Sequence, residues 1–258
     1  MWRANPRHHP GQGLSKCARI AGTFFCSAIK TTAYSVPAMH DQDLLKKSAA
    51  EQALELIQPG CLLGVGTGST VKFFIEALAS VKSHIDAVVS SSDASTELLE
   101  QAGFTVSNLN EVGTLDLYVD GADEATKHLH LIKGGGGALT REKILAEASR
   151  RFVCIIDESK LVGLLGKFPL PVEVIPMARS FVSRQMVKSR GQPVWRQDFV
   201  TDNGNHVIDV YNLKIMSPPE MESRFNQIPG VVTVGIFANR PADTLYIASS
   251  ASVRRMDR

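Results

Sequence analysis

The chain has 258 residues, of which 44% are hydrophobic and 21% are charged, and its formal net charge is +2. These values are typical of a globular protein with one sizeable α/β domain, alone or carrying a smaller one, and they exclude a disordered or fibrous chain. No block of basic residues suggests a nucleic-acid groove, and no run of 18 or more apolar residues is present to span a membrane. We therefore expect neither nucleic acid nor membrane as a partner.

Residues 1–38 differ from the rest of the chain because they contain basic residues but no Asp or Glu. Three interpretations compete: an organellar transit peptide, a secretory signal, and translation that begins at Met39. Small polar residues interrupt the apolar stretch Ile20–Ile29, which weakens the secretory signal. We favour a start at Met39, because a helix pattern follows at once, and we expect residues 1–38 to be disordered, cleaved or not translated. The expected location is cytoplasmic, with organellar import if the segment is a real transit peptide.

Cysteine and histidine residues show no spacing typical of a disulfide framework or a metal site. Cys61 and Cys154 lie in apolar runs, where a thiol is usually a small buried hydrophobe. His128 and His130 alternate as they would on one face of a strand, but no carboxylate or third ligand stands at a fixed spacing from them. We therefore expect reduced thiols and no bound metal.

Short apolar strands alternate with helices in the first part of the chain. Helical spacing of apolar residues predicts helices over residues 41–57, 71–81, 94–102 and 140–150. Short apolar runs predict strands at residues 61–65, 87–90, 105–106, 115–119, 129–132 and 152–156. Every polar or glycine-rich cluster follows a strand directly. This order predicts a Rossmann-like, doubly wound and mostly parallel sheet, in which the carboxyl ends of the strands form the ligand crevice.

The pattern changes at Pro171. Strands are predicted at residues 172–175, 193–196, 207–211 and 231–237, helices at 178–189 and 220–226, and a turn at 202–205. The order β-α-β-β-α-β predicts an inserted ferredoxin-like α+β subdomain. A strand at residues 245–249 then returns to the main sheet. The predicted domains are thus a catalytic domain at 39–170, the subdomain at 171–244, and a return to the catalytic domain at 245–258.

The loop Gly64–Thr70 lies between a predicted strand and a predicted helix. Glycine lets the backbone approach an anion closely, and the N–H groups at a helix N-terminus can hold a phosphate. The loop lacks the lysine of a Walker A motif, and Val71 stands where a dinucleotide fingerprint has its third glycine. The alternative interpretation is a tight turn with a Ser/Thr cap. The sequence of this loop alone does not decide between a phosphate-binding loop and such a turn.

Three carboxylates, Asp120, Asp123 and Glu124, fall within five residues at the end of a predicted strand. Such a group can bind a metal, orient sugar hydroxyls or transfer protons. Glu124 is compatible with a simple surface position. Asp120 directly follows the apolar strand Leu115–Val119, so we expect it to point into the crevice.

The segment Lys133–Lys143 is the sharpest feature of the sequence because it contains four consecutive glycines. Such a run costs backbone entropy, which makes a purely structural origin improbable. Lys133 offers a cation to a developing oxyanion, and Glu142 lies in the first turn of the following helix, from which it can reach back. The alternative for Glu142 is a carboxylate that stabilises the helix dipole. A base, a cation and a phosphate loop together suit proton abstraction next to a carbonyl in a small sugar phosphate.

A series of motifs closely resembles the A-type ribose-5-phosphate isomerase family, in this order: GVGTGST (64–70), SSSDAST (90–96), DLYVDGADE (116–124), IKGGGGALTREKI (132–144), DESK (157–160) and PVEVIPMA (171–178). The similarity runs from about Met39 to the C-terminus and includes VTDNGN and IPGVVTVGIFANR in the predicted subdomain. The resemblance implies interconversion of ribose 5-phosphate and ribulose 5-phosphate, without metal or organic cofactor. It also implies a homodimer of Rossmann-like domains that each carry a ferredoxin-like insertion.

The resemblance assigns roles to individual residues. The proton-transferring glutamate falls on Glu142, the enediolate-stabilising lysine on Lys133, and the aspartates of ring opening and hydroxyl binding on Asp120 and Asp123. Substrate-binding residues fall on Thr67, Gly68, Ser69, Thr70, Gly121, Ala122, Gly134, Gly135, Gly136, Lys160 and Lys46.

One departure is Gly137, where relatives commonly have alanine; we expect it to loosen the loop slightly. The other departure is the segment 1–38, which the family's core does not require and which supports a start at Met39.

Two other classes of protein are compatible with this kind of fold. A non-catalytic sugar-phosphate sensor should carry a DNA-binding helix-turn-helix, and no segment before Met39 reads as two helices. An amino-sugar-phosphate deaminase or a CoA transferase accounts less well for Lys133 and Glu142 on either side of the glycine run. The isomerase is therefore the preferred hypothesis.

Overall fold

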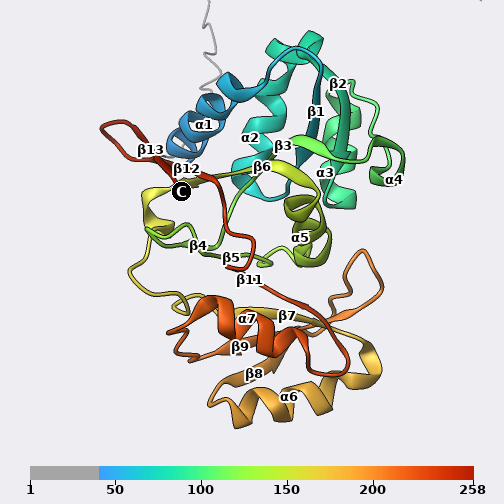
Figure 1. Ribbon diagram of the computed structural model, residues 1–258, viewed down its shortest axis with the longest axis vertical. Helices are drawn as coiled ribbons and strands as arrows, with labels where there is room; N and C mark the ends of the chain where they lie inside the picture. Colours follow the sequence, from blue (N-terminus) through green and yellow to red (C-terminus); the bar gives the residue numbers. More distant parts are fainter. Residues whose placement is uncertain (1–40) are drawn as a thin grey trace, which may run out of the picture. The chain divides into compact units, whose positions relative to one another are not determined.

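The computed structural model describes residues 41–258, and Figure 1 labels its helices and strands. The expectations for residues 1–38 lie outside these described residues. The central feature is a six-stranded sheet in the order β13-β12-β6-β3-β1-β2. Its strands are β1 (Cys61–Val65), β2 (Ile85–Ser90), β3 (Leu115–Asp120), β6 (Ser149–Asp157), β12 (Thr244–Ala248) and β13 (Val253–Asp257).

Helices cover both faces of this sheet, in which only the β12–β13 pair is antiparallel. One face packs against α1, α2 and α3, and the other against α5. The strands between these layers are buried on both faces, which is why they form unbroken apolar runs in the sequence. The helices are α1 (Asp41–Ala53), α2 (Ser69–Ala77), α3 (Asp93–Gln101), α4 (Leu109–Val112) and α5 (Leu139–Glu147), with 3₁₀ helices η1 (Leu54–Leu56), η2 (Leu78–His84), η3 (Glu158–Lys160) and η4 (Pro176–Ala178).

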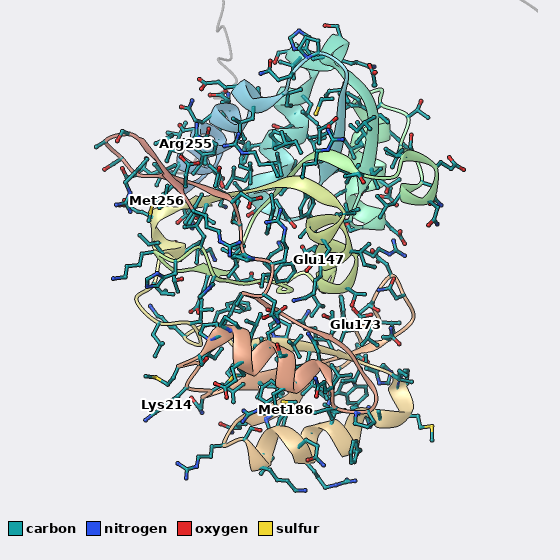
Figure 2. All side chains as sticks on the ribbon, viewed as in Figure 1. Glu147, Glu173, Met186, Lys214, Arg255 and Met256 are labelled. Atoms are coloured by element: carbon teal, nitrogen blue, oxygen red, sulfur yellow. The ribbon has the colours of Figure 1, made fainter. Side chains whose placement is uncertain are left out.

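A second, four-stranded sheet has the order β10-β7-β9-β8, with every neighbouring pair antiparallel. This is the strand order of a β-α-β-β-α-β unit of the ferredoxin-like type. Its elements are β7 (Leu170–Val174), α6 (Arg179–Lys188), β8 (Gln192–Trp195), β9 (His206–Tyr211), α7 (Pro218–Asn226) and β10 (Val231–Val234). The unit has its own apolar core, which includes Met186 (Figure 2). The predicted fold class, an α/β protein with this insertion, is confirmed.

A small three-stranded sheet, β11-β5-β4, lies between the two larger sheets in Figure 1. Its strands are β4 (Glu124–Ala125), β5 (Leu131–Ile132) and β11 (Ile236–Phe237). The single strand predicted at 231–237 is wrong, because Gly235 divides it between the four-stranded and the three-stranded sheets. The Gly235 N–H donates to Pro171 O at 2.8 Å, and Gly235 O accepts from Lys133 N at 2.9 Å. A Cβ at this position would lie 2.2 Å from Lys133 O, so only glycine allows so close an approach.

The structure also differs from the predicted elements elsewhere. The strand expected at residues 105–106 is only an isolated bridge between Val88 and Val106. The helix predicted to end at residue 150 ends at Glu147, since β6 already begins at Ser149. Strand β13 was not predicted because it is a partly exposed edge strand with charged residues and no clear apolar alternation.

The division into domains remains a proposal. Residues 39–258 form one compact unit, although the four-stranded sheet and the six-stranded sheet have separate apolar cores. We keep the boundaries 39–170, 171–244 and 245–258 on the strength of those cores. Among residues 41–258, no helix has the length and hydropathy needed to cross a bilayer.

Candidate active site

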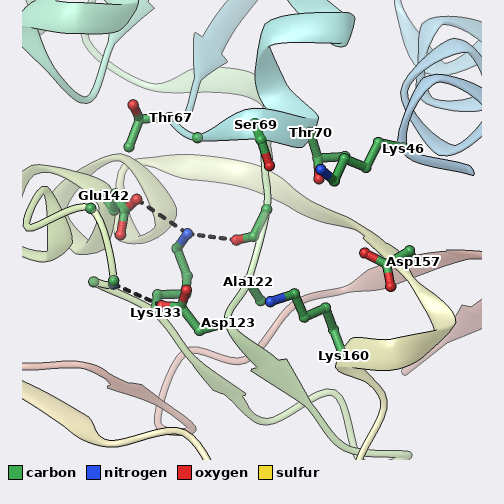
Figure 3. A pocket seen from close by; sticks show the side chains of 15 residues that line it. Lys46, Thr67, Ser69, Thr70, Ala122, Asp123, Lys133, Glu142, Asp157 and Lys160 are labelled. Carbon is green, nitrogen blue, oxygen red and sulfur yellow. Dashed lines mark hydrogen bonds and ion pairs between the residues drawn. The ribbon is translucent and has the colours of Figure 1, made fainter. Parts of the chain in front are cut away.

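A cavity lies where the loops after β1, β3 and β6 converge, at the carboxyl ends of these strands (Figure 3). Its volume is about 160 Å³, below the roughly 300–1,000 Å³ of pockets that bind drug-sized ligands, so it suits a small ligand. Every predicted site residue lines it except Asp120, and Asp157 lines it in addition. The full lining is Lys46, Thr67, Gly68, Ser69, Thr70, Gly121, Ala122, Asp123, Lys133, Gly134, Gly135, Gly136, Glu142, Asp157 and Lys160.

The end of the β1–α2 loop and the start of α2, residues 67–70, form one wall of the cavity. Gly68 is the residue before the helix and has φ +107°, a conformation that favours glycine. The free N–H groups and the positive end of the α2 dipole suit an anion. Lys46 of α1 and Lys160 of η3 add two ammonium groups to the lining. The charges and N–H groups of this wall therefore suit an anion such as a phosphate.

Asp120 lies behind the cavity wall and is completely buried. Its Oδ1 accepts from Thr67 N at 3.1 Å and from Gly121 N at 2.7 Å, while Oδ2 accepts from the Tyr118 hydroxyl. The same Oδ2 lies 2.7 Å from Lys133 Nζ. Because both oxygens are engaged by the protein, Asp120 holds the phosphate loop and the lysine in place rather than facing the ligand.

Lys133 and Glu142 form a buried ion pair at one end of the cavity, joined by a dashed line in Figure 3. Lys133 Nζ lies 3.3 Å from Glu142 Oε1 and donates to Gly121 O at 2.6 Å. The glycine run, residues 134–137, turns the chain so that α5 begins at Leu139 and brings Glu142 back to the lysine. No residue within 41–258 donates a hydrogen bond to the second carboxylate oxygen, Glu142 Oε2.

Burial sets the ionisation of these groups. Burial raises the pKa of Glu142 to about 8. The attraction of Lys133 opposes this shift, and the carboxylates of Asp120 and Asp123 add to it. Burial by itself lowers the pKa of Lys133, but the charges of Asp120 and Glu142 leave that pKa above its usual value. Lys133 is thus cationic at neutral pH, and Glu142 exchanges a proton near neutrality, as a general base must.

Asp123 faces the cavity from the turn after β3 (Figure 3). Its Oδ2 accepts from Gly135 N at 2.8 Å, which ties it to the glycine run. Burial raises the pKa of Asp123, although the Gly135 bond and the charges of Lys133 and Lys160 oppose the shift. A carboxyl group in this environment can exchange a proton with a ligand hydroxyl.

Asp157 is the lining residue that the sequence did not predict as a site residue. It is the last residue of β6 and is 2% exposed, and its Oδ1 accepts from Ser159 N at 2.9 Å. The available signal was its position at the end of an apolar run, since Asp157 ends β6 as Asp120 ends β3. In Figure 3 it lies with Lys160 at the end of the cavity away from Glu142.

Metal ligands are not grouped in the described part of the chain. Within residues 41–258, no three His, Cys, Asp or Glu side chains are arranged to hold a metal ion. The rings of His128 and His130 are 6.2 Å apart between centroids, on the segment between β4 and β5. The cation beside Glu142 in this structure is the ammonium group of Lys133.

Comparison with known proteins decides the family. The model of the family "Ribose 5-phosphate isomerase A (phosphoriboisomerase A)" matches residues 87–252. The chain belongs to this family. Membership confirms the resemblance seen in the sequence and decides against a sugar-phosphate sensor, an amino-sugar-phosphate deaminase and a CoA transferase.

Solved structures of the family agree in fold. The ribose 5 phosphate isomerase A of Neisseria gonorrhoeae is 48% identical, with a TM-score of 0.83, over 85% of this chain and 98% of its own. The isomerase of Methanocaldococcus jannaschii is 37% identical, with a TM-score of 0.79, over 84% and 100%. A D-ribose-5-phosphate isomerase in complex with phospho-erythronic acid is 36% identical, with a TM-score of 0.82, over 85% and 100%.

Gly137, the one departure noted within the family's motifs, has a structural explanation in this chain. Its φ is +83°, and a Cβ at this position would lie 2.2 Å from Cζ of Phe199. The Phe199 ring therefore occupies the space that an alanine side chain would need. The expectation that glycine loosens the loop does not take account of this ring, which packs directly on the glycine run.

We predict that Gly137→Ala lowers the free energy of unfolding by about 1–3 kcal/mol, because a side chain is strained at φ +83° and the added methyl group clashes with Phe199. Phe199→Ala should relieve the clash, so the double variant should be more stable than the sum of the two single effects by at least about 0.5 kcal/mol. Urea denaturation followed by circular dichroism measures all three.

The neighbouring Gly136→Ala is the matched control. A Cβ on Gly136 would meet only Thr67 Cγ2, at 4.0 Å, so its stability should stay close to that of the unmodified chain. Strict additivity of the Gly137 and Phe199 effects would contradict the packing explanation.

Proposed function

We propose that this chain interconverts D-ribose 5-phosphate and D-ribulose 5-phosphate through an enediolate, with Glu142 as the base. The proposal rests on the contacts of the two carboxylate oxygens of Glu142. One of its oxygens lies 3.3 Å from the Lys133 ammonium, and the other receives no hydrogen bond from residues 41–258. This buried carboxylate lines a cavity whose opposite wall suits a phosphate. Family membership supports the same reaction.

The substrate enters with its phosphate at residues 67–70, between the ammonium groups of Lys46 and Lys160. Those groups lie apart from Glu142 along the cavity in Figure 3, which leaves the carbonyl end of an open-chain pentose near the base. The family structure with phospho-erythronic acid supports a phosphorylated, enediolate-like ligand, since that compound joins a phosphate to a planar carboxylate resembling the two oxygens of an enediolate. We assign ring opening to Asp123, which faces the cavity and exchanges a proton with the sugar hydroxyl.

The isomerisation then needs one proton to move between two carbons. Glu142 takes the proton from C2 of the aldose, the electron pair forms the C1–C2 double bond, and the carbonyl oxygen at C1 becomes anionic. Lys133 stabilises that oxygen, because an ammonium group in a buried site attracts a developing charge strongly. The proton of the C2 hydroxyl passes to O1, which becomes a hydroxyl group, and Glu142 returns its own proton to C1 as the C2 oxygen becomes the carbonyl. Asp120 and Tyr118 do not touch the substrate in this scheme; they hold Lys133 in place.

The resemblance also implies a homodimer, and we propose that the chain assembles as one. Large apolar side chains are exposed on and next to the ferredoxin-like subdomain, and such a surface is typical of an interface. They are Ile175, Met177, Phe181, Val187 and Val194. Light scattering should give the mass of two chains, and the mass of one chain would contradict the proposal.

A cytoplasmic location is likewise proposed on the family resemblance.

We predict that Glu142→Gln lowers kcat by about 10²–10⁴-fold, because glutamine has the same shape but cannot accept the C2 proton. Ribose 5-phosphate should still bind, since the phosphate wall is untouched. A coupled assay of ribulose 5-phosphate formation measures kcat, and calorimetry measures binding. The control is Glu147→Gln, an exposed position on the same helix (Figure 2), which should retain full activity. Full activity in the Glu142→Gln variant would contradict the mechanism.

The pH profile tests the raised pKa of Glu142, which is about 8. The base must be ionised, so kcat should rise with pH, about tenfold per unit below the pKa, and level off above it. The rate increases with pH because a raised pKa keeps the carboxyl protonated, and so unable to act as a base, over a wider range of pH. Stopped assays from pH 6.5 to 9.5 avoid most of the titration of the substrate phosphate, whose second pKa is about 6. A flat profile over this range would be inconsistent with Glu142 as the titrating base.

A further inference from the structure

The loop between β8 and β9, residues 196–205, extends from the four-stranded sheet to the catalytic residues. In Figure 1 it is the orange loop that rises towards α5. The sequence predicted only a turn at residues 202–205. In the structure this loop contacts the glycine run through two side chains, those of Arg196 and Phe199.

The guanidinium group of Arg196 lies between the carboxylate of Asp209 and the carbonyl groups of Gly134 and Gly135. Its Nε and Nη2 donate to the carboxylate oxygens of Asp209, at 2.9 and 2.6 Å. Its Nη1 donates to Gly135 O at 3.1 Å, and Gly134 O lies at 3.4–3.5 Å from Nη2 and Nη1. Asp209 belongs to β9, so a strand of the subdomain holds the guanidinium against two carbonyl groups of the glycine run.

The planarity of the peptide bond connects these carbonyls to the cavity. In a trans peptide the C=O of one residue and the N–H of the next point in opposite directions. A Gly134 C=O directed at Arg196 therefore turns the Gly135 N–H away from it, and that N–H donates to Asp123 Oδ2 at 2.8 Å. By the same geometry, the Gly135 C=O bond turns the N–H of Gly136 away from Arg196, and Gly136 lines the cavity.

The glycine run needs an external partner to keep this orientation. Glycine has the largest backbone freedom of any residue, so four in succession do not hold one conformation by themselves. Gly134 and Gly137 have φ of +102° and +83°, and the Gly137 N–H donates to Gly134 O at 2.9 Å. That internal bond engages the peptide groups 134–135 and 136–137 but leaves the central one, 135–136, to be oriented by the bond from Arg196 to Gly135 O, while Asp123 accepts from the Gly135 N–H.

The β8–β9 loop is itself held firmly. Glu173, which is completely buried on β7, accepts from the side chains of Thr201, Asn203 and Asn205 at 2.8–3.1 Å. Figure 2 labels Glu173 where the four-stranded sheet approaches α5. On the side of the catalytic domain, Arg141 donates to Asn203 Oδ1 at 3.0 Å and also to Asp93 of α3. Arg196 is thus presented by a loop that is fixed at both of its sides.

We propose that Arg196 is a positioning residue for the isomerisation: through the Gly134 and Gly135 carbonyls it orients the peptide groups that hold Asp123 and face the substrate. This inference rests on the proposed function. A lysine cannot replace it, because one ammonium group does not provide the planar set of donors that joins Asp209 to both carbonyls. Arg196 does not touch the substrate and takes no proton.

The test is Arg196→Lys, which keeps the charge and removes the planar donor set. We expect kcat to fall about 10–100-fold, the range for a catalytic group displaced by about 1 Å, with little change in KM because the phosphate wall is intact. Hydrogen exchange followed by mass spectrometry should show faster exchange in the peptide containing residues 134–137. The control is Arg184→Lys, an exposed position on α6, which should match the unmodified chain in both measurements.

Each outcome decides between the alternatives. A normal kcat in Arg196→Lys, or a lower kcat without faster exchange, overturns the inference. If that variant does not fold, Asp209→Asn keeps Arg196 and weakens its anchor; it must lower kcat in the same direction, and a normal kcat there also overturns the inference. If the unmodified chain does not isomerise ribose 5-phosphate, the proposed function fails, while the exchange measurement still tests whether Arg196 orders the glycine run.

Discussion

The buried ammonium group of Lys133, held between the carboxylates of Asp120 and Glu142, is the interaction on which the site depends. Removing three charged groups from water is unfavourable, and the ion pairs compensate for it only where the geometry is good. Each partner comes from a different segment: Asp120 from the end of β3, Glu142 from the first turn of α5. The sheet, the phosphate loop that donates to Asp120 and the glycine run all act to bring these groups within ion-pair distance.

The ferredoxin-like subdomain contributes to the same constraint although it supplies none of the residues that line the cavity. At Gly235 its chain passes so close to Lys133 that the two backbones are hydrogen-bonded. Phe199 packs on Gly137, and Arg196 binds the carbonyl groups of the same segment. A glycine run has little conformational preference, and this subdomain supplies the contacts that select one conformation.

Much of the fold could be predicted because its signals are local. Strands buried on both faces appear as unbroken apolar runs, and the residues that follow them lie at one edge of a parallel sheet. Signals of tertiary origin were missed: the division of 231–237 at Gly235 depends on the approach of another backbone, and edge strand β13 has no apolar alternation. Asp157, which lines the cavity, was not predicted there, although it ends β6 as Asp120 ends β3. Asp120 was expected to face the crevice, but Thr67, Gly121, Tyr118 and Lys133 engage both of its oxygens.

The sequence by itself determined the family, the fold class and most of the elements in their order, since these follow from residue types and their spacing. Only the tertiary structure decided that Asp123 and Glu142 line the cavity while both oxygens of Asp120 are engaged within the protein, because this depends on how distant segments pack together. It also decided the ionisation of Glu142, whose pKa is raised first of all by burial and then adjusted by Lys133 and two carboxylates. Burial and the distances between charges are properties of the folded chain, and no spacing along the sequence contains them.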